Sequence, residues 1–172
     1  MVYIMKFHVG GACYSNEDYA IGAATCELAV RSGKFTLMQV AGLGQWVKPS
    51  KQRADLVAII MALRWALQRY NELNTAPITS VCIYTGSRYA VNCVNKWIVK
   101  WKANNWVNRH GEEVANRDLI EEAALLESKL RQFGSVTYVY APLNKGHNVR
   151  HYAKRGVSDL IELRNQYLAD NA

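Results

Sequence analysis

Residues 97–106 read Trp-Ile-Val-Lys-Trp-Lys-Ala-Asn-Asn-Trp, the most distinctive stretch of the sequence. Tryptophans and lysines alternate within it. On a helix, Trp97 and Trp101 would lie on one face, because side chains four residues apart are neighbours there. Indole rings beside ammonium groups are typical of surfaces that follow a sugar–phosphate backbone and stack on bases. The alternative is that these rings pack as core.

The sequence on either side of this stretch switches between strand and helix patterns. The predicted elements, in order, are strands at 3–13, 19–30 and 35–43, a helix that begins after Ser50, a strand at 78–85, helical pieces at 88–94 and 96–103, a helix at 116–132, a strand at 136–141 and a last helix at 149–168. This order predicts an α/β fold, with a five-stranded mixed sheet flanked by helices.

Length and composition indicate one compact domain. The chain has 172 residues and half of them are apolar, which is enough to bury a core. No apolar run is long enough to cross a membrane, and the first residues do not resemble an export signal. Four cysteines without a Cys-x-x-Cys pair are typical of a reduced protein. We therefore expect an intracellular protein, cytoplasmic or nuclear, with no membrane partner.

The positive charge is unevenly spread. The net charge is +7, and 11 of the 21 basic residues lie in three windows that contain no acidic residue, at 47–53, 95–110 and 143–156. Such windows predict a polyanionic partner. The alternative is solvated surface charge that keeps the protein soluble.

Short motifs along the chain resemble those of one known family. They are residues 9–13 (Val-Gly-Gly-Ala-Cys), 52–55 (Gln-Arg-Ala-Asp), 84–89 (Tyr-Thr-Gly-Ser-Arg-Tyr), 97–106, 113–116 (Glu-Val-Ala-Asn) and 139–142 (Val-Tyr-Ala-Pro). Their order resembles type 1 ribonuclease H of the cellular kind over nearly the whole chain. The resemblance implies a ribonuclease H-like fold in a single domain, residues 1–172, with the family's basic protrusion at about 95–110.

The resemblance also implies a reaction, which the site residues do not match. The family cleaves the RNA strand of RNA/DNA hybrids with two Mg²⁺ held by four carboxylates. Its acidic positions fall on Val9, Asp55, Gly86 and Lys154, and its mobile histidine falls on Asn144. One carboxylate cannot hold two divalent ions. We therefore predict a degenerate site with no metal or other cofactor, a protein that is not an enzyme, and a salt bridge between Asp55 and Lys154.

Groups that bind nucleic acid in the family have counterparts here. The resemblance places a phosphate pocket at Lys48, Ser50 and Asn116, and minor-groove contacts at Asn16 and Gln52. The full set of predicted nucleic-acid-binding residues is Asn16, Lys48, Ser50, Lys51, Gln52, Lys96, Trp97, Lys100, Trp101, Lys102, Trp106 and Asn116. These groups suit readout of shape and of 2′-hydroxyls. Ser50 could equally be only a helix cap.

The function predicted from these features is that of a catalytically inactive ribonuclease H-like protein that binds RNA/DNA hybrid or double-stranded RNA. Two alternatives stay open. One is a protein–protein interaction module or scaffold, as a homodimer or within a nucleic-acid-processing complex. The other is a residual ribonuclease H with a rebuilt metal site.

Overall fold

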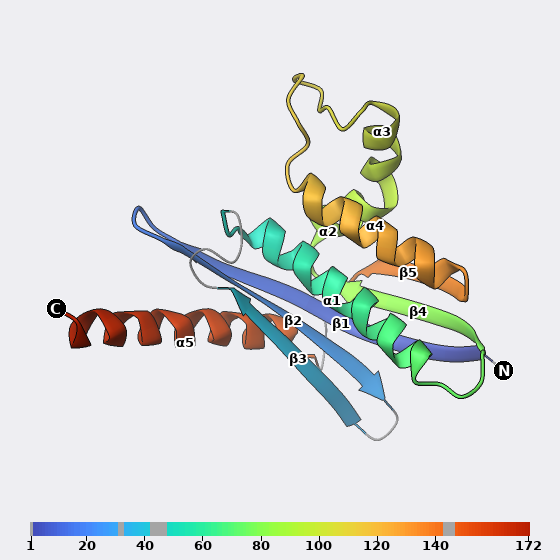
Figure 1. The fold of residues 1–172 in the computed structure, drawn as a ribbon, viewed down its shortest axis with the longest axis horizontal. Coiled ribbons are helices and arrows are strands. Elements are labelled where there is room, and N and C mark those ends of the chain that lie inside the picture. The colour runs from blue at the N-terminus through green and yellow to red at the C-terminus, as the bar shows by residue number, and fades with distance from the viewer. Residues whose placement is uncertain (1, 31–32, 42–47, 143–146) are drawn as a thin grey trace.

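In the computed structural model, one mixed sheet carries helices on both faces (Figure 1). The structure describes residues 2–30, 33–41, 48–142 and 147–172. The elements are β1 (Val2–Ser15), β2 (Ala20–Val30), β3 (Gly33–Ala41), α1 (Lys51–Asn71), β4 (Ile78–Thr85), α2 (Arg88–Asn92), the π-helical turn η1 (Cys93–Trp97), α3 (Ile98–Ala103), α4 (Arg117–Arg131), β5 (Gly134–Tyr140) and α5 (Val149–Asp170). The predicted α/β fold with a five-stranded mixed sheet is confirmed.

The strand order is β3-β2-β1-β4-β5. β1, β2 and β3 pair antiparallel, whereas β4 pairs parallel with both β1 and β5. In this register Val9 lies opposite Cys26 on one side and Thr85 on the other. The middle of β1 therefore lies beside the carboxyl end of β4, where Gly86 comes next in the chain.

The two faces of the sheet are covered differently. Met5, Phe7 and Val9 alternate along β1 and point into a core that α1 completes. Ala12 and Ile21 belong to a smaller cluster with Ala153 and Val157 of α5, and α5 packs on β1 and β2. The last turns of α5 extend past the sheet (Figure 1).

The first turn of α1 is fixed by its cap. Ser50 has an extended backbone, and its hydroxyl accepts a hydrogen bond from the Arg53 N–H at 3.1 Å. This satisfies one of the free donors at a helix start. The cap fixes the start of the helix at Lys51. Lys51 and Asp55 then lie one turn apart, next to β1.

The protrusion at about 95–110 is built on a helix that changes its winding. Residues 88–103 run through α2, η1 and α3 without a break, and the Ile98 N–H bonds to the Cys93 carbonyl, five residues back. The loop beyond α3 is closed by an isolated bridge between Val107 and Glu113. The sequence predicts two separate helical pieces, but a π turn joins them. No helix that the structure describes is long and apolar enough to span a membrane.

Candidate nucleic-acid interface

A pocket of about 250 Å³ opens where β1, the first turn of α1, the end of β4 and the start of α5 meet. The described residues that line it are Val9, Gly10, Gly11, Lys51, Asp55, Gly86, Ser87, Ala141, Pro142, His147, Val149 and Arg150. Three of the positions that the resemblance assigns to the family's carboxylates, Val9, Asp55 and Gly86, therefore line one pocket. Lys154, the fourth, is exposed on α5 and is not among these described lining residues.

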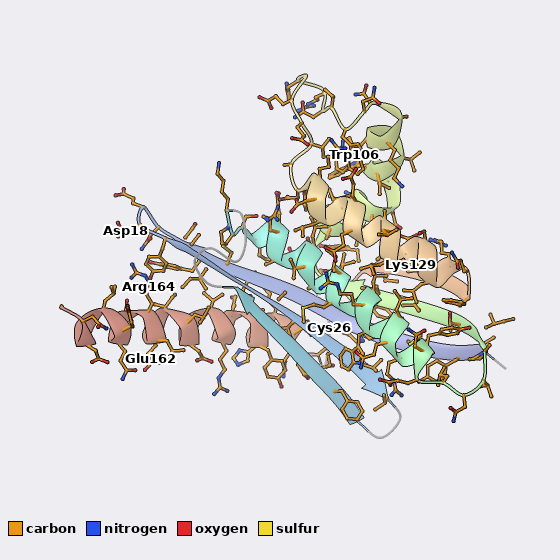
Figure 2. All side chains as sticks on the ribbon, in the orientation of Figure 1. Asp18, Cys26, Trp106, Lys129, Glu162 and Arg164 are labelled. Carbon is orange, nitrogen blue, oxygen red and sulfur yellow. The ribbon has the colours of Figure 1, made fainter. Side chains whose placement is uncertain are left out.

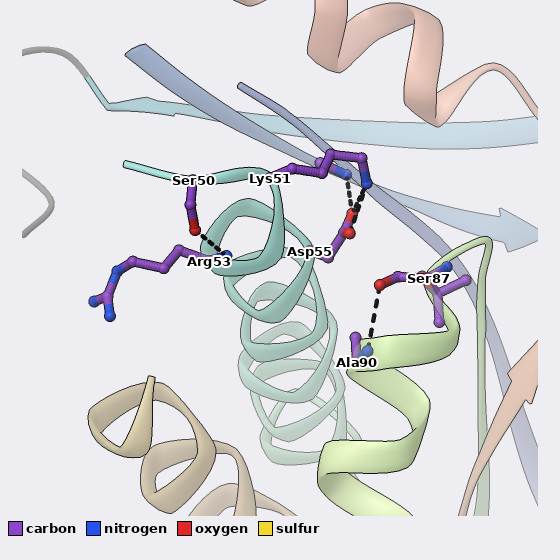
Figure 3. A network of polar contacts seen from close by, with 8 residues as sticks. Ser50, Lys51, Arg53, Asp55, Ser87 and Ala90 are labelled. Atoms are coloured by element: carbon purple, nitrogen blue, oxygen red, sulfur yellow. Dashed lines mark hydrogen bonds and ion pairs between the residues drawn. The ribbon is translucent and has the colours of Figure 1, made fainter. Parts of the chain in front are cut away.

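Asp55 is the buried carboxylate of this pocket, with 5% of its side chain exposed. Its Oδ1 accepts the Gly11 N–H at 3.0 Å, and the Lys51 ammonium bonds to Oδ1 at 2.7 Å and to Oδ2 at 2.6 Å (Figure 3). The predicted Asp55–Lys154 salt bridge is therefore wrong. Lys51 is the partner because residues four apart on a helix are neighbours. The four-residue spacing of Lys51 and Asp55 is visible in the sequence and is the signal that identifies this pair.

The donor set does not fit the two Mg²⁺ ions that the resemblance implies. Val9 is apolar and buried, and Gly86 has no side chain. Both Asp55 oxygens are bonded to the Lys51 ammonium. Within residues 2–30, 33–41, 48–142 and 147–172, no group of three His, Cys, Asp or Glu could hold a metal ion. Asn144, the predicted counterpart of the family's histidine, lies outside the described residues.

His147, which lines the same pocket, contacts a buried glutamate of β2. Glu27 of β2 is buried, and its carboxylate contacts His147 Nδ1 and, at 3.6 Å, the ammonium of Lys34. The His147 ring stacks on His8, with ring centroids 3.3 Å apart, and His8 stacks on Tyr84 in turn. His147 is thus held against the sheet. No local pattern in the sequence signals this contact, because Glu27 and His147 are 120 residues apart.

The predicted phosphate pocket forms a second region, at the start of α4. Lys48 and Asn116 line one hollow there, together with Arg117 and three carboxylates. Each of these carboxylates is paired with an arginine, Asp118 with Arg53 and both Glu113 and Glu121 with Arg117. Asn116 has a left-handed backbone with φ of 61°, its Oδ1 accepts from Arg53 Nη1 at 3.3 Å, and its Nδ2 donates to the Tyr89 hydroxyl at 3.0 Å. Ser50 lies one turn before Arg53 as the cap of α1. The structure therefore brings the predicted trio to one corner of the molecule.

Arg53 organises this corner, although it is not among the residues predicted from the sequence. Its guanidinium forms two hydrogen bonds with the Asp118 carboxylate, at 3.0 and 2.5 Å. These bonds hold the pKa of Asp118 below its ordinary value. The paired Arg53 side chain is 13% exposed, so it fixes Asn116 while Lys48 stays exposed.

Aromatic rings in contact with one another connect this corner to the protrusion. Tyr89 contacts Trp97 edge-on at 6.0 Å, Trp97 contacts Trp101 at 5.6 Å, and Trp101 contacts Trp106 at 6.3 Å. Burial raises the pKa of Tyr89 to about 12, so its hydroxyl stays neutral. Trp106 is 7% exposed and lies inside the protrusion (Figure 2), whereas Trp97 and Trp101 are half-buried.

The remaining predicted residues are spread more widely. Lys96, Lys100 and Lys102 are exposed on the protrusion, and Lys51 and Gln52 are exposed at the start of α1. Asn16 sits in the β1–β2 turn, where its side-chain oxygen accepts the N–H groups of Asp18 and Tyr19. Figure 2 shows Asp18 at the tip of this hairpin, well away from Trp106. Asn16 is therefore apart from the predicted residues of the protrusion.

This strand order, with helices on both faces and a cationic aromatic protrusion, defines a ribonuclease H-like α/β domain. A family model for RNase H matches residues 4–155, and the chain belongs to the RNase H family. Ribonuclease H of Francisella philomiragia subsp. philomiragia is 32% identical over 121 residues, which are 70% of this chain and 66% of that protein. Ribonuclease H of Francisella tularensis subsp. novicida gives the same values. The match thus spans just under two thirds of these relatives.

Solved structures with low sequence identity share the fold. A foamy viral protease–reverse transcriptase in complex with double-stranded DNA has a TM-score of 0.66 at 18% identity, covering 90% of this chain and 94% of that chain. LC11-RNase H1 in complex with an RNA/DNA hybrid has a TM-score of 0.63 at 10% identity, covering 91% and 99%. LC9-RNase H1, a type 1 RNase H with the type 2 active-site motif, has a TM-score of 0.58 at 18% identity, covering 90% and 70%.

These relatives correct one prediction. The sequence predicted a chain that is not an enzyme, but the similar proteins are named ribonuclease H, which is an enzyme. That prediction rested on a count of carboxylates at four positions. Such a count describes how well a metal pair would fit, and it does not measure activity.

Proposed function

We propose that this domain binds RNA/DNA hybrids through backbone phosphates and the shape of the duplex. The observation that carries the proposal is that Lys48 and Asn116 line one hollow, and that Asn116 is linked through Tyr89 to Trp97. A cation, an amide and a row of rings in one line are the groups that a sugar–phosphate backbone requires.

The arrangement favours two points of contact on one duplex. Lys48 and Asn116 present a cation and an amide to one phosphate, and the left-handed backbone of Asn116 is held by bonds from Arg53 and to Tyr89. Lys100 and Lys102 are exposed farther along the protrusion, beside Trp101. Phosphate contacts of this kind set the position of a duplex and carry no base sequence.

Preference for a duplex with an RNA strand is expected from the start of α1. Gln52 is exposed next to the capping Ser50, where an amide can donate to and accept from a 2′-hydroxyl. Support comes also from LC11-RNase H1, which was solved with an RNA/DNA hybrid, and from the family match.

The test is a titration of RNA/DNA hybrid, double-stranded RNA and double-stranded DNA, read by fluorescence anisotropy. Lys48→Asn removes the cation at a residue with φ of 49°, a backbone that asparagine tolerates. One lost phosphate contact should weaken hybrid binding roughly eightfold near 0.1 M salt, because each contributes about 0.9 to the salt slope. Recovered hybrid is checked on a denaturing gel, so that binding and cleavage are separated.

The matched control is Lys129→Gln. Lys129 is exposed near the far end of α4, away from Trp106 (Figure 2), and should leave hybrid affinity unchanged. If the unmodified protein bound no hybrid at low salt, or if Lys48→Asn and Lys129→Gln behaved alike, the proposal would be wrong. A protein–protein interaction module would then be the better account.

A further inference from the structure

The described lining of the pocket beside Asp55 has a net positive charge. Among its described lining residues, the side chains that carry full charge are Lys51, Asp55 and Arg150. Asp55 is neutralised by Lys51, so the Arg150 guanidinium remains in excess. His147 contacts the buried Glu27, which is not among the described lining residues. A pocket with this balance attracts an anion.

Lys51 has hydrogen-bonding capacity left for a ligand. An ammonium group has three donors, and Asp55 takes two of them. The side chain of Lys51 is 48% exposed, whereas that of Asp55 is 5% exposed. Lys51 therefore keeps one donor beyond those bonded to Asp55, on a side chain that solvent reaches. Asp55 anchors Lys51 at the pocket wall and removes the freedom that an unpaired lysine would lose on binding.

The start of α5 adds donors of the same kind. Val149 and Arg150, the first residues of this 22-residue helix, both line the pocket. Asn148 precedes them and forms no side-chain cap within the described part of the chain, and no acidic residue lies in the first turn. The N–H groups of a first turn lack intrahelical partners and favour negative charge.

We propose that this pocket binds a phosphate of the nucleic acid directly, through Lys51, Arg150 and the first turn of α5, with no divalent cation between them. This inference rests on the proposed function and names a second phosphate site, separate from the corner at Lys48 and Asn116. The Lys51 ammonium supplies, as part of the chain, the positive charge that a bound cation would otherwise bring next to Asp55.

The geometry makes a divalent ion a competitor of Lys51. An ion bound at Asp55 would have to displace an ammonium that contacts both carboxylate oxygens. Gly86 leaves room for a test of this point. A Cβ at Gly86 would lie 3.7 Å from the Ala141 carbonyl oxygen and farther from its other neighbours, which is ordinary van der Waals contact. Gly86→Asp would thus add a carboxylate to the pocket without a backbone clash.

The experiment measures hybrid affinity for the full chain in EDTA and in Mg²⁺ at matched ionic strength. The unmodified protein should bind equally in both, within about twofold. Arg150→Gln should weaken binding roughly eightfold near 0.1 M salt in both buffers and lower the salt slope by about 0.9. Gly86→Asp should weaken binding in EDTA, because the added carboxylate repels the phosphate, and Mg²⁺ should restore part of the affinity.

The matched control is Arg155→Gln. Arg155 is exposed on the same helix but lines a different hollow, beside Tyr152 and Asp159. The inference is overturned if wild-type binding needs Mg²⁺, if Arg150→Gln loses no more affinity than Arg155→Gln, or if Gly86→Asp binds as tightly as wild type in EDTA. Each of these outcomes would reject the second phosphate site without changing the conclusion drawn from Lys48→Asn. Absence of wild-type binding in both buffers would instead reject the proposed function itself.

Discussion

Gly11 lies where β1 and α1 approach each other closely. A Cβ at this position would lie 2.5 Å from the Ala54 carbonyl carbon and 2.6 Å from the Asp55 nitrogen. Both neighbours are backbone atoms of a helix, so they cannot move aside. We expect Gly11→Ala to lower the free energy of unfolding by about 1–3 kcal/mol or more, as overpacking does. Urea unfolding followed by far-UV circular dichroism measures the change.

Gly86→Ala is the matched control, because its new methyl group would meet only ordinary contacts. It should unfold at nearly the same urea concentration as the unmodified protein. Equal midpoints for the two alanine variants would show that β1 and α1 can separate at Gly11, and that the short Gly11–Asp55 contact is not imposed by packing.

The stability of the fold depends on pH through Asp118, and Arg53 fixes the direction of that dependence. The guanidinium lowers the pKa of the carboxyl group, so the folded state holds the ionised form more strongly than the unfolded state. The pair stabilises the fold above the ordinary pKa of an aspartate, and this contribution is lost as pH falls through the lowered value. The effect on stability is small because the Asp118 side chain is 60% exposed.

Carboxyl chemical shifts of Asp118, followed by NMR from neutral to acid pH, measure this difference directly. In Arg53→Gln the midpoint should return toward the ordinary range. An unchanged midpoint in that variant would mean that Arg53 and Asp118 do not pair in solution.

The contacts of a single residue can be predicted from the sequence when its partner is only a few positions away in the chain. Ser50 as a helix cap was predicted and confirmed, because capping acts over three residues. The predicted partner of Asp55, Lys154, is wrong, because Lys51, one turn away on α1, bonds to both carboxylate oxygens. The Arg53–Asn116 and Asn116–Tyr89 contacts join segments 63 and 27 residues apart, which no local pattern reveals.

At the level of elements, the π turn η1 sets the direction in which the protrusion points. A π turn holds one residue more than an α turn, and this changes the rise and rotation of the helix that follows it. Deleting Asn95, an exposed residue within the turn, should restore α-helical winding and turn Trp97 away from Tyr89. We expect weaker hybrid binding and an altered near-ultraviolet circular dichroism spectrum, with far-UV helicity retained.

Asn95→Ala keeps the chain length and should preserve both the spectrum and the affinity. If the deletion variant kept wild-type affinity, the orientation of the protrusion would be irrelevant to binding. The sequence predicted helix on both sides of this turn but could not show the π winding, because the pattern of apolar residues does not distinguish an i+5 bond from a bend between two helices.

For the molecule as a whole, the clustered positive charge predicts a steep salt dependence. Contacts at about five phosphates would give a slope near −4 to −5 for log K against log[salt] on a B-form duplex, and a shallower one on single strands. Lys48, Lys51, Lys100, Lys102 and Arg150 are exposed and available for these contacts. Titrations at several NaCl concentrations measure the slope, and a value close to zero would exclude backbone binding by these groups.

The sheet could be predicted as a whole because the residue patterns of its strands differ clearly from those of the helices between them. Strands at 3–13, 19–30 and 78–85 were placed within a few residues of β1, β2 and β4. Leu43, the predicted end of the third strand, lies outside the described residues. The prediction that the chain is not an enzyme was wrong. It took the lack of carboxylates at Val9, Gly86 and Lys154, which bears on metal binding, as a statement about activity.

The length of α5 has a consequence for how the fold opens. Val149, Ala153 and Val157 of its first half are buried against the sheet, whereas Leu163, Tyr167 and Leu168 are 61%, 67% and 48% exposed. A helix of two or three turns is marginal in water without packing. Amide hydrogens should therefore exchange with deuterium in a gradient, fast near residue 168 and slow near residue 153, because the far half of α5 unwinds without disturbing the sheet.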